Sequence, residues 1–252
     1  MPPRCVPSAP MLDAFADQGA SLRQARPPAP ARLITLVSQG EERHEQALLW
    51  QLCQALQSYG YPPVVLDGTS LESNEHPGLV DLMQHTPWGA LGATEDSDWA
   101  VMPAAAGLRA LGRAQPRPLD LLGSLFQGCG VLVVYARAEL LIPVLADSAA
   151  QPVLAVAPGR HALLRGYRTI KQFQQQGRLA PTLVSLITSS LRNADQLART
   201  TGRSLQKCAL TFLGCETDMI TVRSEPQADH RSDDVRRLAL RLLENGAVPF
   251  MA

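Results

Sequence analysis

Positions 38–46 follow an apolar run and precede a helical pattern, which is where α/β proteins bind ligands. They read Ser-Gln-Gly-Glu-Glu-Arg-His-Glu-Gln. A turn that binds phosphate needs glycines, whose backbone N–H groups can approach the phosphate, and a lysine to balance its charge. This turn has one glycine, no lysine and three glutamates. A carboxylate about 4 Å from a phosphate charge would cost about 4 kcal/mol at an effective dielectric of about 20. We therefore expect the turn to repel phosphate.

No other set of side chains predicts catalysis or metal binding. His44 and Glu45 are neighbours, but a lone pair of this kind is usually solvated surface, and the sequence contains no HExxH, GxSxG or GxGxxG motif. The cysteines are scattered without a CxxC pair, which is typical of reduced thiols in a cytosolic protein. They are Cys5, Cys53, Cys129, Cys208 and Cys215. We expect no catalytic residue, no metal and no cofactor.

The composition excludes several classes of protein. The 252 residues suit one α/β domain with a tail, and 46% hydrophobic residues allow a packed core. The 23 basic and 23 acidic residues balance, which gives no general attraction to nucleic acid or to an anionic membrane. No apolar run approaches the roughly 20 residues of a spanning helix, and no signal peptide is visible. The sequence predicts a cytoplasmic protein.

Apolar runs and helical patterns alternate from residue 32 onward. Alternating strands and helices favour parallel βαβ units, and so a doubly wound, mostly parallel sheet of the α/β class with helices on both faces over residues 32–252. The expected strands are 33–38, 63–67, 99–102, 130–135, 152–157 and 182–188. The expected helices are 45–59, 79–84, 118–126, 138–148, 161–176, 195–207 and 233–245.

Residues 1–31 form a proline-rich tail in this interpretation. Seven prolines bracket one short helical candidate at 11–26, in which Leu12, Phe15 and Leu22 fall near one face. A helix this short is marginal in water and would form best on a partner.

The stretch from Leu33 to Asp67 resembles the opening of the MinD/ParA family of deviant-Walker P-loop ATPases, without a gap. The family pattern is an apolar strand, then S-G-K-G-G-V-G-K-T, a helix with an N-L-A-x-A-L-A-x-x-G ending, and a strand closing in L-L-D. On this match the family's dimer-bridging lysine falls at Gly40, its phosphate lysine at Glu45 and its magnesium-binding threonine at Gln46. The loop glycines fall at Gln39, Glu41, Glu42 and His44, and Arg43 completes the loop.

The other half of the family's nucleotide site, the Walker B strand, is also altered in this sequence. The run 130–135 resembles the family's Walker B strand, but Tyr135 stands near the place of its aspartate. Segments 98–111, 152–173 and 210–218 resemble later parts of the family in the same order. The resemblance implies a P-loop fold whose nucleotide site is degenerate. On this hypothesis the protein is not an enzyme. A divergent ATPase that still binds ATP is the alternative.

The tail indicates one branch of the family. Residues 17–23 read Asp-Gln-Gly-Ala-Ser-Leu-Arg, which resembles the D-Q-A-x-x-L-R motif ahead of the ATPase domain in the flagellar-number regulators FlhG and FleN. There the helix engages and stimulates the FlhF-type signal-recognition GTPase. Gly19 replaces the alanine, which weakens the helix by about 1 kcal/mol. The partner-binding residues implied are Leu12, Phe15, Asp17, Gln18, Leu22 and Arg23.

The last expected helix has an apolar face and several arginines elsewhere. The relatives carry a C-terminal amphipathic membrane helix, whereas a helix that covers the core is the simpler interpretation. Its apolar residues are Val235, Leu238, Ala239, Leu242 and Leu243.

The leading hypothesis is a nucleotide-independent regulator of flagellar number and placement. It would bind an FlhF-type GTPase through its tail, and a flagellar transcription activator or switch component through its body. Partners would recruit it to the cell pole or inner membrane, as a monomer or a nucleotide-independent dimer that binds no nucleic acid. The alternative is a MinD/ParA-like scaffold for another machine, such as cellulose synthesis or secretion.

Overall fold

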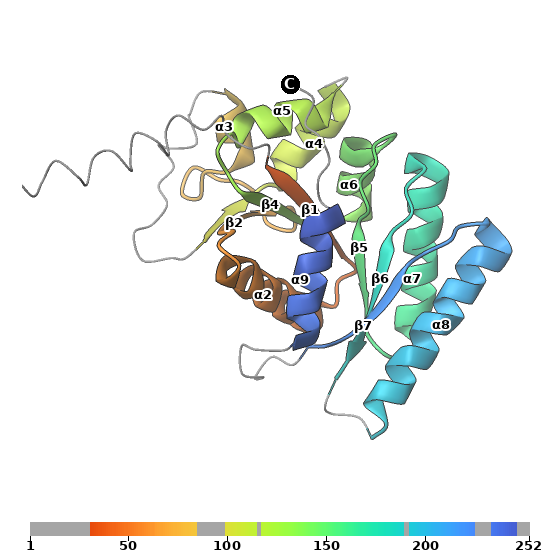
Figure 1. Ribbon diagram of the computed structural model, residues 1–252. Coiled ribbons are helices and arrows are strands. Elements are labelled where there is room, and N and C mark those ends of the chain that lie inside the picture. The colour runs from red at the N-terminus through yellow and green to blue at the C-terminus, as the bar shows by residue number, and fades with distance from the viewer. Residues whose placement is uncertain (1–30, 85–98, 115–116, 189–191, 225–232, 246–252) are drawn as a thin grey trace, which may run out of the picture.

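A computed structural model describes residues 31–84, 99–114, 117–188, 192–224 and 233–245 (Figure 1). Within these ranges, seven parallel strands form one sheet in the order β3-β2-β4-β1-β5-β6-β7. The strands are β1 (Arg32–Ser38), β2 (Pro63–Asp67), β3 (Ala100–Pro103), β4 (Val131–Arg137), β5 (Val153–Val156), β6 (Thr182–Ile187) and β7 (Met219–Arg223). The proposed partner-binding residues of the tail lie outside the described ranges.

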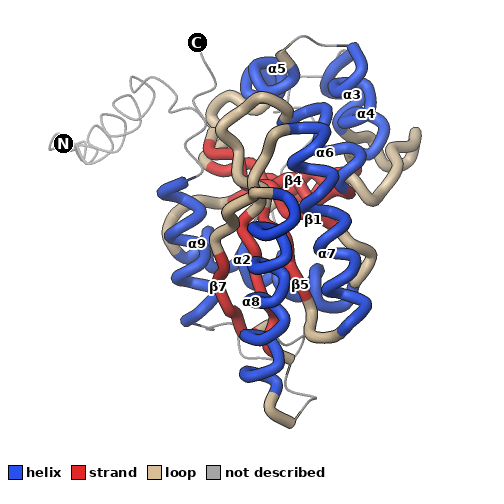
Figure 2. Tube along the Cα trace, turned by 90° about the vertical axis from the view of Figure 1, so that its right-hand side faces the viewer, coloured by secondary structure: helices blue, strands red, loops and turns tan. Residues whose placement is uncertain are grey.

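Helices cover both faces of the sheet, as predicted. Buried side chains of α2 and α9 form one core cluster with one face of the strands, and those of α3 to α8 form the other. Figure 2 shows the strands between these layers, with α9 on one side and α4, α6 and α7 on the other. The helices are α2 (Glu42–Ser58), α3 (Leu79–Gln84), α4 (Ala105–Ala114), α5 (Pro118–Leu125), α6 (Ala138–Leu145), α7 (Arg160–Gln172), α8 (Ala194–Leu213) and α9 (Asp233–Asn245).

Strand β1 lies at the centre of the sheet, between β4 and β5. Its side chains alternate between the two core clusters, with Ile34 and Leu36 on the α2 side and Leu33 and Val37 on the other. A strand buried on both faces needs an unbroken apolar run, which is why the sequence showed no alternation there. The parallel register puts Leu36 beside Tyr135 of β4.

Two elements were not predicted, α4 and β7. The segment that forms α4 contains two glycines, which disfavour a helix when the sequence is taken alone. In the structure these glycines allow close helix packing, because a Cβ at Gly107 would lie 2.6 Å from the Cβ of Leu79. The Glu72 carboxylate accepts the Ala106 and Gly107 backbone N–H groups at 2.7 and 2.8 Å, which stabilises the start of α4.

Several predicted boundaries shift. Helix α2 begins three residues before the predicted Glu45, and α8 runs on to Leu213 rather than ending at Lys207. Helix α7 is followed by a π-helical turn, η2 (Phe173–Gly177), which begins inside the predicted helix 161–176 and ends one residue beyond it.

The apolar face of α9 packs into the core. Val235, Leu238, Ala239, Leu242 and Leu243 are all buried, and α9 contacts α2, β7 and β1. The core-covering interpretation of this helix is therefore correct for its apolar face. Within the part of the chain that the structure describes, no helix has the length and apolar character that crossing a membrane requires.

Candidate functional site

The turn between β1 and α2 lies at the carboxyl end of the central strand, where doubly wound folds bind ligands. Gly40 has a φ of +80°, in the left-handed region that glycine adopts without strain. The backbone then enters α2 at Glu42, with Glu41 at the N-cap position. The turn therefore keeps the strand–turn–helix arrangement of a phosphate-binding loop, but with this chain's own side chains.

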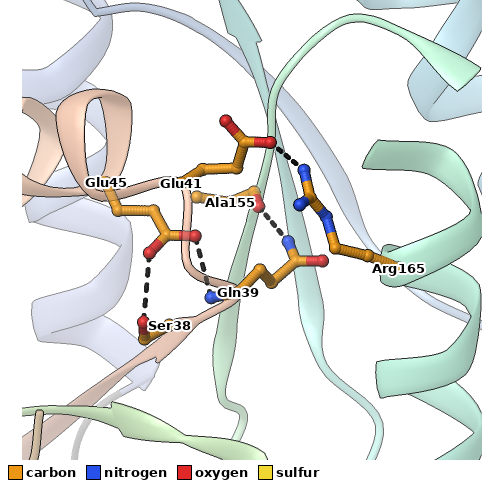
Figure 3. A network of polar contacts seen from close by, with 6 residues as sticks. All are labelled: Ser38, Gln39, Glu41, Glu45, Ala155 and Arg165. Carbon is orange, nitrogen blue, oxygen red and sulfur yellow. Dashed lines mark hydrogen bonds and ion pairs between the residues drawn. The ribbon is translucent and has the colours of Figure 1, made fainter. Parts of the chain in front are cut away.

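The carboxylate of Glu45 fills the inside of the turn (Figure 3). Glu45 sits in the first turns of α2 and is only 1% exposed. One carboxylate oxygen accepts the Gln39 backbone N–H at 2.8 Å, and the other accepts the Ser38 hydroxyl at 3.2 Å. The turn thus holds an anion that belongs to the protein, and the nearby start of α2 favours its negative charge.

Tyr135 supplies a third hydrogen bond to the same carboxylate. It lies at the end of β4, next to β1, and its hydroxyl donates to Glu45 Oε2 at 2.8 Å. Burial raises the pKa of the Tyr135 phenol, and the negative charge of Glu45 raises it further. The phenol therefore stays protonated and remains a donor at neutral pH.

A second set of contacts ties the turn to β5 and α7. The Gln39 side-chain amide donates to the Ala155 carbonyl, and Arg165 of α7 forms an ion pair with Glu41 (Figure 3). Glu41 thus forms an ion pair with Arg165, and Glu45 accepts hydrogen bonds from Ser38, Gln39 and Tyr135.

A cleft of about 550 Å³ opens beside this turn, between the start of α6 and the side of α7. Its lining includes Ser38, Gln39 and Gly40 of the turn, together with cationic side chains from β4 and α7. These cations are Arg137, Arg165, Arg168 and Lys171.

Four other predicted loop residues, Glu42, Arg43, His44 and Gln46, belong to the start of α2. Arg43 and Gln46 are exposed on α2, and His44 is half-buried. The Glu42 side chain lies outside what the structure describes. Sequence reasoning located Glu45 and Tyr135 but missed their contact, and it missed Arg165, which is 124 residues from its partner Glu41. Among the described residues, no group of His, Cys, Asp and Glu side chains is placed to hold a metal.

No protein-family model matches the sequence, and no curated protein matches it. Solved structures do match, at low identity. The MinC:MinD cell division protein complex of Aquifex aeolicus is 11% identical with a TM-score of 0.54, over 86% of this chain and 94% of that chain. The septum site-determining protein MinD of Pyrococcus horikoshii, complexed with Mg-ADP, is 15% identical with a TM-score of 0.51, over 87% and 93%.

A third match is a synthase rather than a cell division protein. Cobyrinic acid a,c-diamide synthase of Mycobacterium smegmatis, with a bound ATP analogue and magnesium, is 13% identical with a TM-score of 0.54, over 85% of this chain and 95% of that chain. The chain therefore has the fold of MinD/ParA P-loop ATPases. At this identity the likeness shows the fold alone, and proteins with different functions share it.

Proposed function

We propose that this chain is a nucleotide-independent pseudo-ATPase that regulates flagellar number and placement by binding proteins. It would act in the cytoplasm, first of all on an FlhF-type GTPase, and partners would recruit it to the cell pole or inner membrane. The fold supports a MinD/ParA-like scaffold, and the make-up of the first turn and the motif in the tail support the finer assignment.

The observation that carries the nucleotide part of the proposal is the buried carboxylate of Glu45 inside the turn. A phosphate entering this turn would meet a carboxylate that already accepts hydrogen bonds from Ser38, Gln39 and Tyr135. Displacing it would leave a buried charge without these donors, which costs several kcal/mol. The turn offers no lysine in return.

Calorimetry with ATP and magnesium tests this part. The wild-type chain should show no binding in the micromolar range. The Glu45→Lys variant should show no binding either, because it still has Gln46 and Tyr135 and still lacks the loop glycines. Saturable binding by the wild type at tens of micromolar would refute the pseudo-ATPase assignment.

The alternative of a divergent ATPase draws support from the structures with bound Mg-ADP and with a bound ATP analogue. It requires the Glu45 carboxylate to leave the turn when nucleotide arrives. The same calorimetry separates the two functions, since only the divergent ATPase gives heat that saturates with ATP.

The partner assignment depends on the tail motif, residues 17–23. A pulldown with the full chain as bait should recover the FlhF-type GTPase of the same organism. Leu22→Ala should abolish recovery, because it removes an apolar anchor of the helix, whereas Gln18→Ala should keep it. Failure of the wild-type bait would favour the scaffold for another machine, such as cellulose synthesis or secretion.

A further inference from the structure

The cleft beside the turn carries positive charge that the described part of the chain does not neutralise. Arg137, Arg168 and Lys171 line it, all three are exposed, and none forms an ion pair with a described residue. Arg165 also lines it but is paired with Glu41. One acidic side chain, Glu139, lies in the lining. Three unpaired cations against one carboxylate leave the cleft net positive.

This concentration of charge is local. The whole chain has formal net charge zero, so a basic cleft is not the consequence of a basic surface. A concave surface with one sign of charge focuses the potential and attracts groups of the opposite sign. The cleft is therefore a candidate site for a ligand with several negative charges.

The uncharged part of the lining indicates the shape of that ligand. Thr169, Gln172 and Gln175 follow one another on the side of α7 and η2 that lines the cleft. From Arg165 to Gln175 the chain advances by about 15 Å at helical rise. Amides and hydroxyls spaced along this length can bond the N–H and C=O groups of an extended backbone.

The lining disfavours a nucleotide as the ligand. Among the described residues that form it, Ala138 has the only hydrocarbon side chain, and there is no aromatic ring. Small-molecule sites are mostly lined by apolar and aromatic groups, whereas this cleft offers a base no aromatic ring and only guanidinium planes to stack on. Arginine clusters instead recognise acidic peptide motifs.

We propose that this cleft binds an extended, carboxylate-rich segment of a partner protein, with Arg137, Arg168 and Lys171 contacting the carboxylates. The cleft would be a docking site on the α/β domain, in addition to the site proposed in the tail. It therefore goes beyond the proposed function. The cleft proposal and the proposed function can fail independently. The experiment below leaves the tail motif unchanged and does not use the FlhF-type GTPase.

Fluorescence anisotropy of the full-length chain tests the site. The probe is a fluorescein-labelled peptide of alternating glutamate and glycine, and its glutamine–glycine counterpart is the uncharged comparison. The test variant is Arg168→Gln with Lys171→Gln. The matched control is Arg203→Gln with Lys207→Gln, which removes the same two residue types from exposed positions of α8.

We expect the acidic peptide to bind the wild type and the α8 control equally. The cleft variant should bind about tenfold more weakly, since loss of two charge contacts of about 0.7 kcal/mol each corresponds to tenfold. The glutamine–glycine peptide should not bind, and binding should weaken with added salt.

Three outcomes would overturn the proposal. The wild type could fail to bind the acidic peptide, or the α8 control could lose as much affinity as the cleft variant, which would indicate unspecific attraction. Inorganic tripolyphosphate, titrated alone by calorimetry, could bind more tightly than the peptide and lose affinity in the cleft variant. The cleft would then be a site for a small anion.

Discussion

Glu45 stands where the family pattern that the sequence resembles has a lysine, and hydrogen bonds within the protein accommodate its carboxylate. A buried, unpartnered carboxylate would be costly, but this one accepts hydrogen bonds from two side chains and one backbone N–H. Tyr135, near the place of the family's aspartate, supplies one of them. The two departures from the family pattern are therefore complementary, because one supplies an acceptor and the other a donor.

Replacing Glu45 with alanine should destabilise the fold. The Ser38 and Tyr135 hydroxyls and the Gln39 N–H would lose their acceptor, and each buried donor left unpaired costs about 1–3 kcal/mol. We expect a loss of about 3 kcal/mol in the free energy of unfolding, measured in urea. Glu244→Ala, at an exposed position of α9, should change it by less than about 0.5 kcal/mol. Equal effects of the two variants would show that the Glu45 contacts contribute little.

The raised pKa of Tyr135 predicts a dependence of stability on alkaline pH. The unfolded chain ionises this phenol near its ordinary pKa of about 10, while the folded chain retains the proton. Above about pH 10 the unfolded state therefore binds fewer protons, and the free energy of unfolding falls as pH rises.

Tyr135→Phe should show a smaller fall than the wild type when urea unfolding is compared between about pH 8 and pH 11. Tyr167→Phe on α7, which leaves Tyr135 intact, should keep the wild-type dependence. Identical slopes for all three proteins would contradict a buried, protonated phenol at Tyr135.

At the scale of elements, the sequence predicted the α/β class and most strands, because buried parallel strands are continuous apolar runs. Strand β7 was missed, since it is short, lies at the edge of the sheet and is largely half-buried. Helix α4 was missed because glycine disfavours a helix. The contacts that support it, of Gly107 with Leu79 and of its first N–H groups with Glu72, come from residues far from it in sequence.

The same limit applies to the candidate site. The turn could be located from its sequence, because a strand, a turn and a helix follow one another along the chain. The contacts of Glu45 with Tyr135 and of Glu41 with Arg165 could not be predicted from the sequence. They depend on the pairing of β1 with β4 and on the position of α7. Long-range packing, rather than local propensity, decides where these side chains point.

The short helix that the sequence predicts in the tail should bind and stimulate the proposed partner as an isolated peptide. A peptide of residues 8–28 should raise the GTPase rate of the FlhF-type partner, with Leu12, Phe15 and Leu22 as apolar anchors. By the family resemblance, Gln18 would reach toward the partner's nucleotide site, where an amide can orient the attacking water.

Two variants of this peptide separate binding from stimulation. The Gln18→Ala peptide should bind but stimulate less, whereas the Leu22→Ala peptide should lose binding. Both are measured by anisotropy and by GTP turnover. A wild-type peptide that neither binds nor stimulates would remove the flagellar assignment and leave the fold assignment intact.

At the scale of the whole molecule, the proposed function implies that a chain with this fold does not change its oligomeric state when nucleotide is added. By the family resemblance, relatives clamp ATP between two subunits with a bridging lysine, whose place in this chain is taken by Gly40. The backbone there has a φ of +80°, a conformation that costs a lysine roughly 1 kcal/mol or more. Neither the side chain nor the backbone of this turn suits the clamp.

We therefore expect a molar mass that does not depend on nucleotide, whether the chain is a monomer or a dimer through another surface. Light scattering of the full chain should give the same mass with and without ATP and magnesium. The Gly40→Lys variant should also give the same mass in both conditions, because a lysine alone restores neither the loop glycines nor a phosphate-binding residue at Glu45. A mass that rises when ATP is added to the wild type would show nucleotide-dependent assembly, and it would overturn the nucleotide-independent function proposed above.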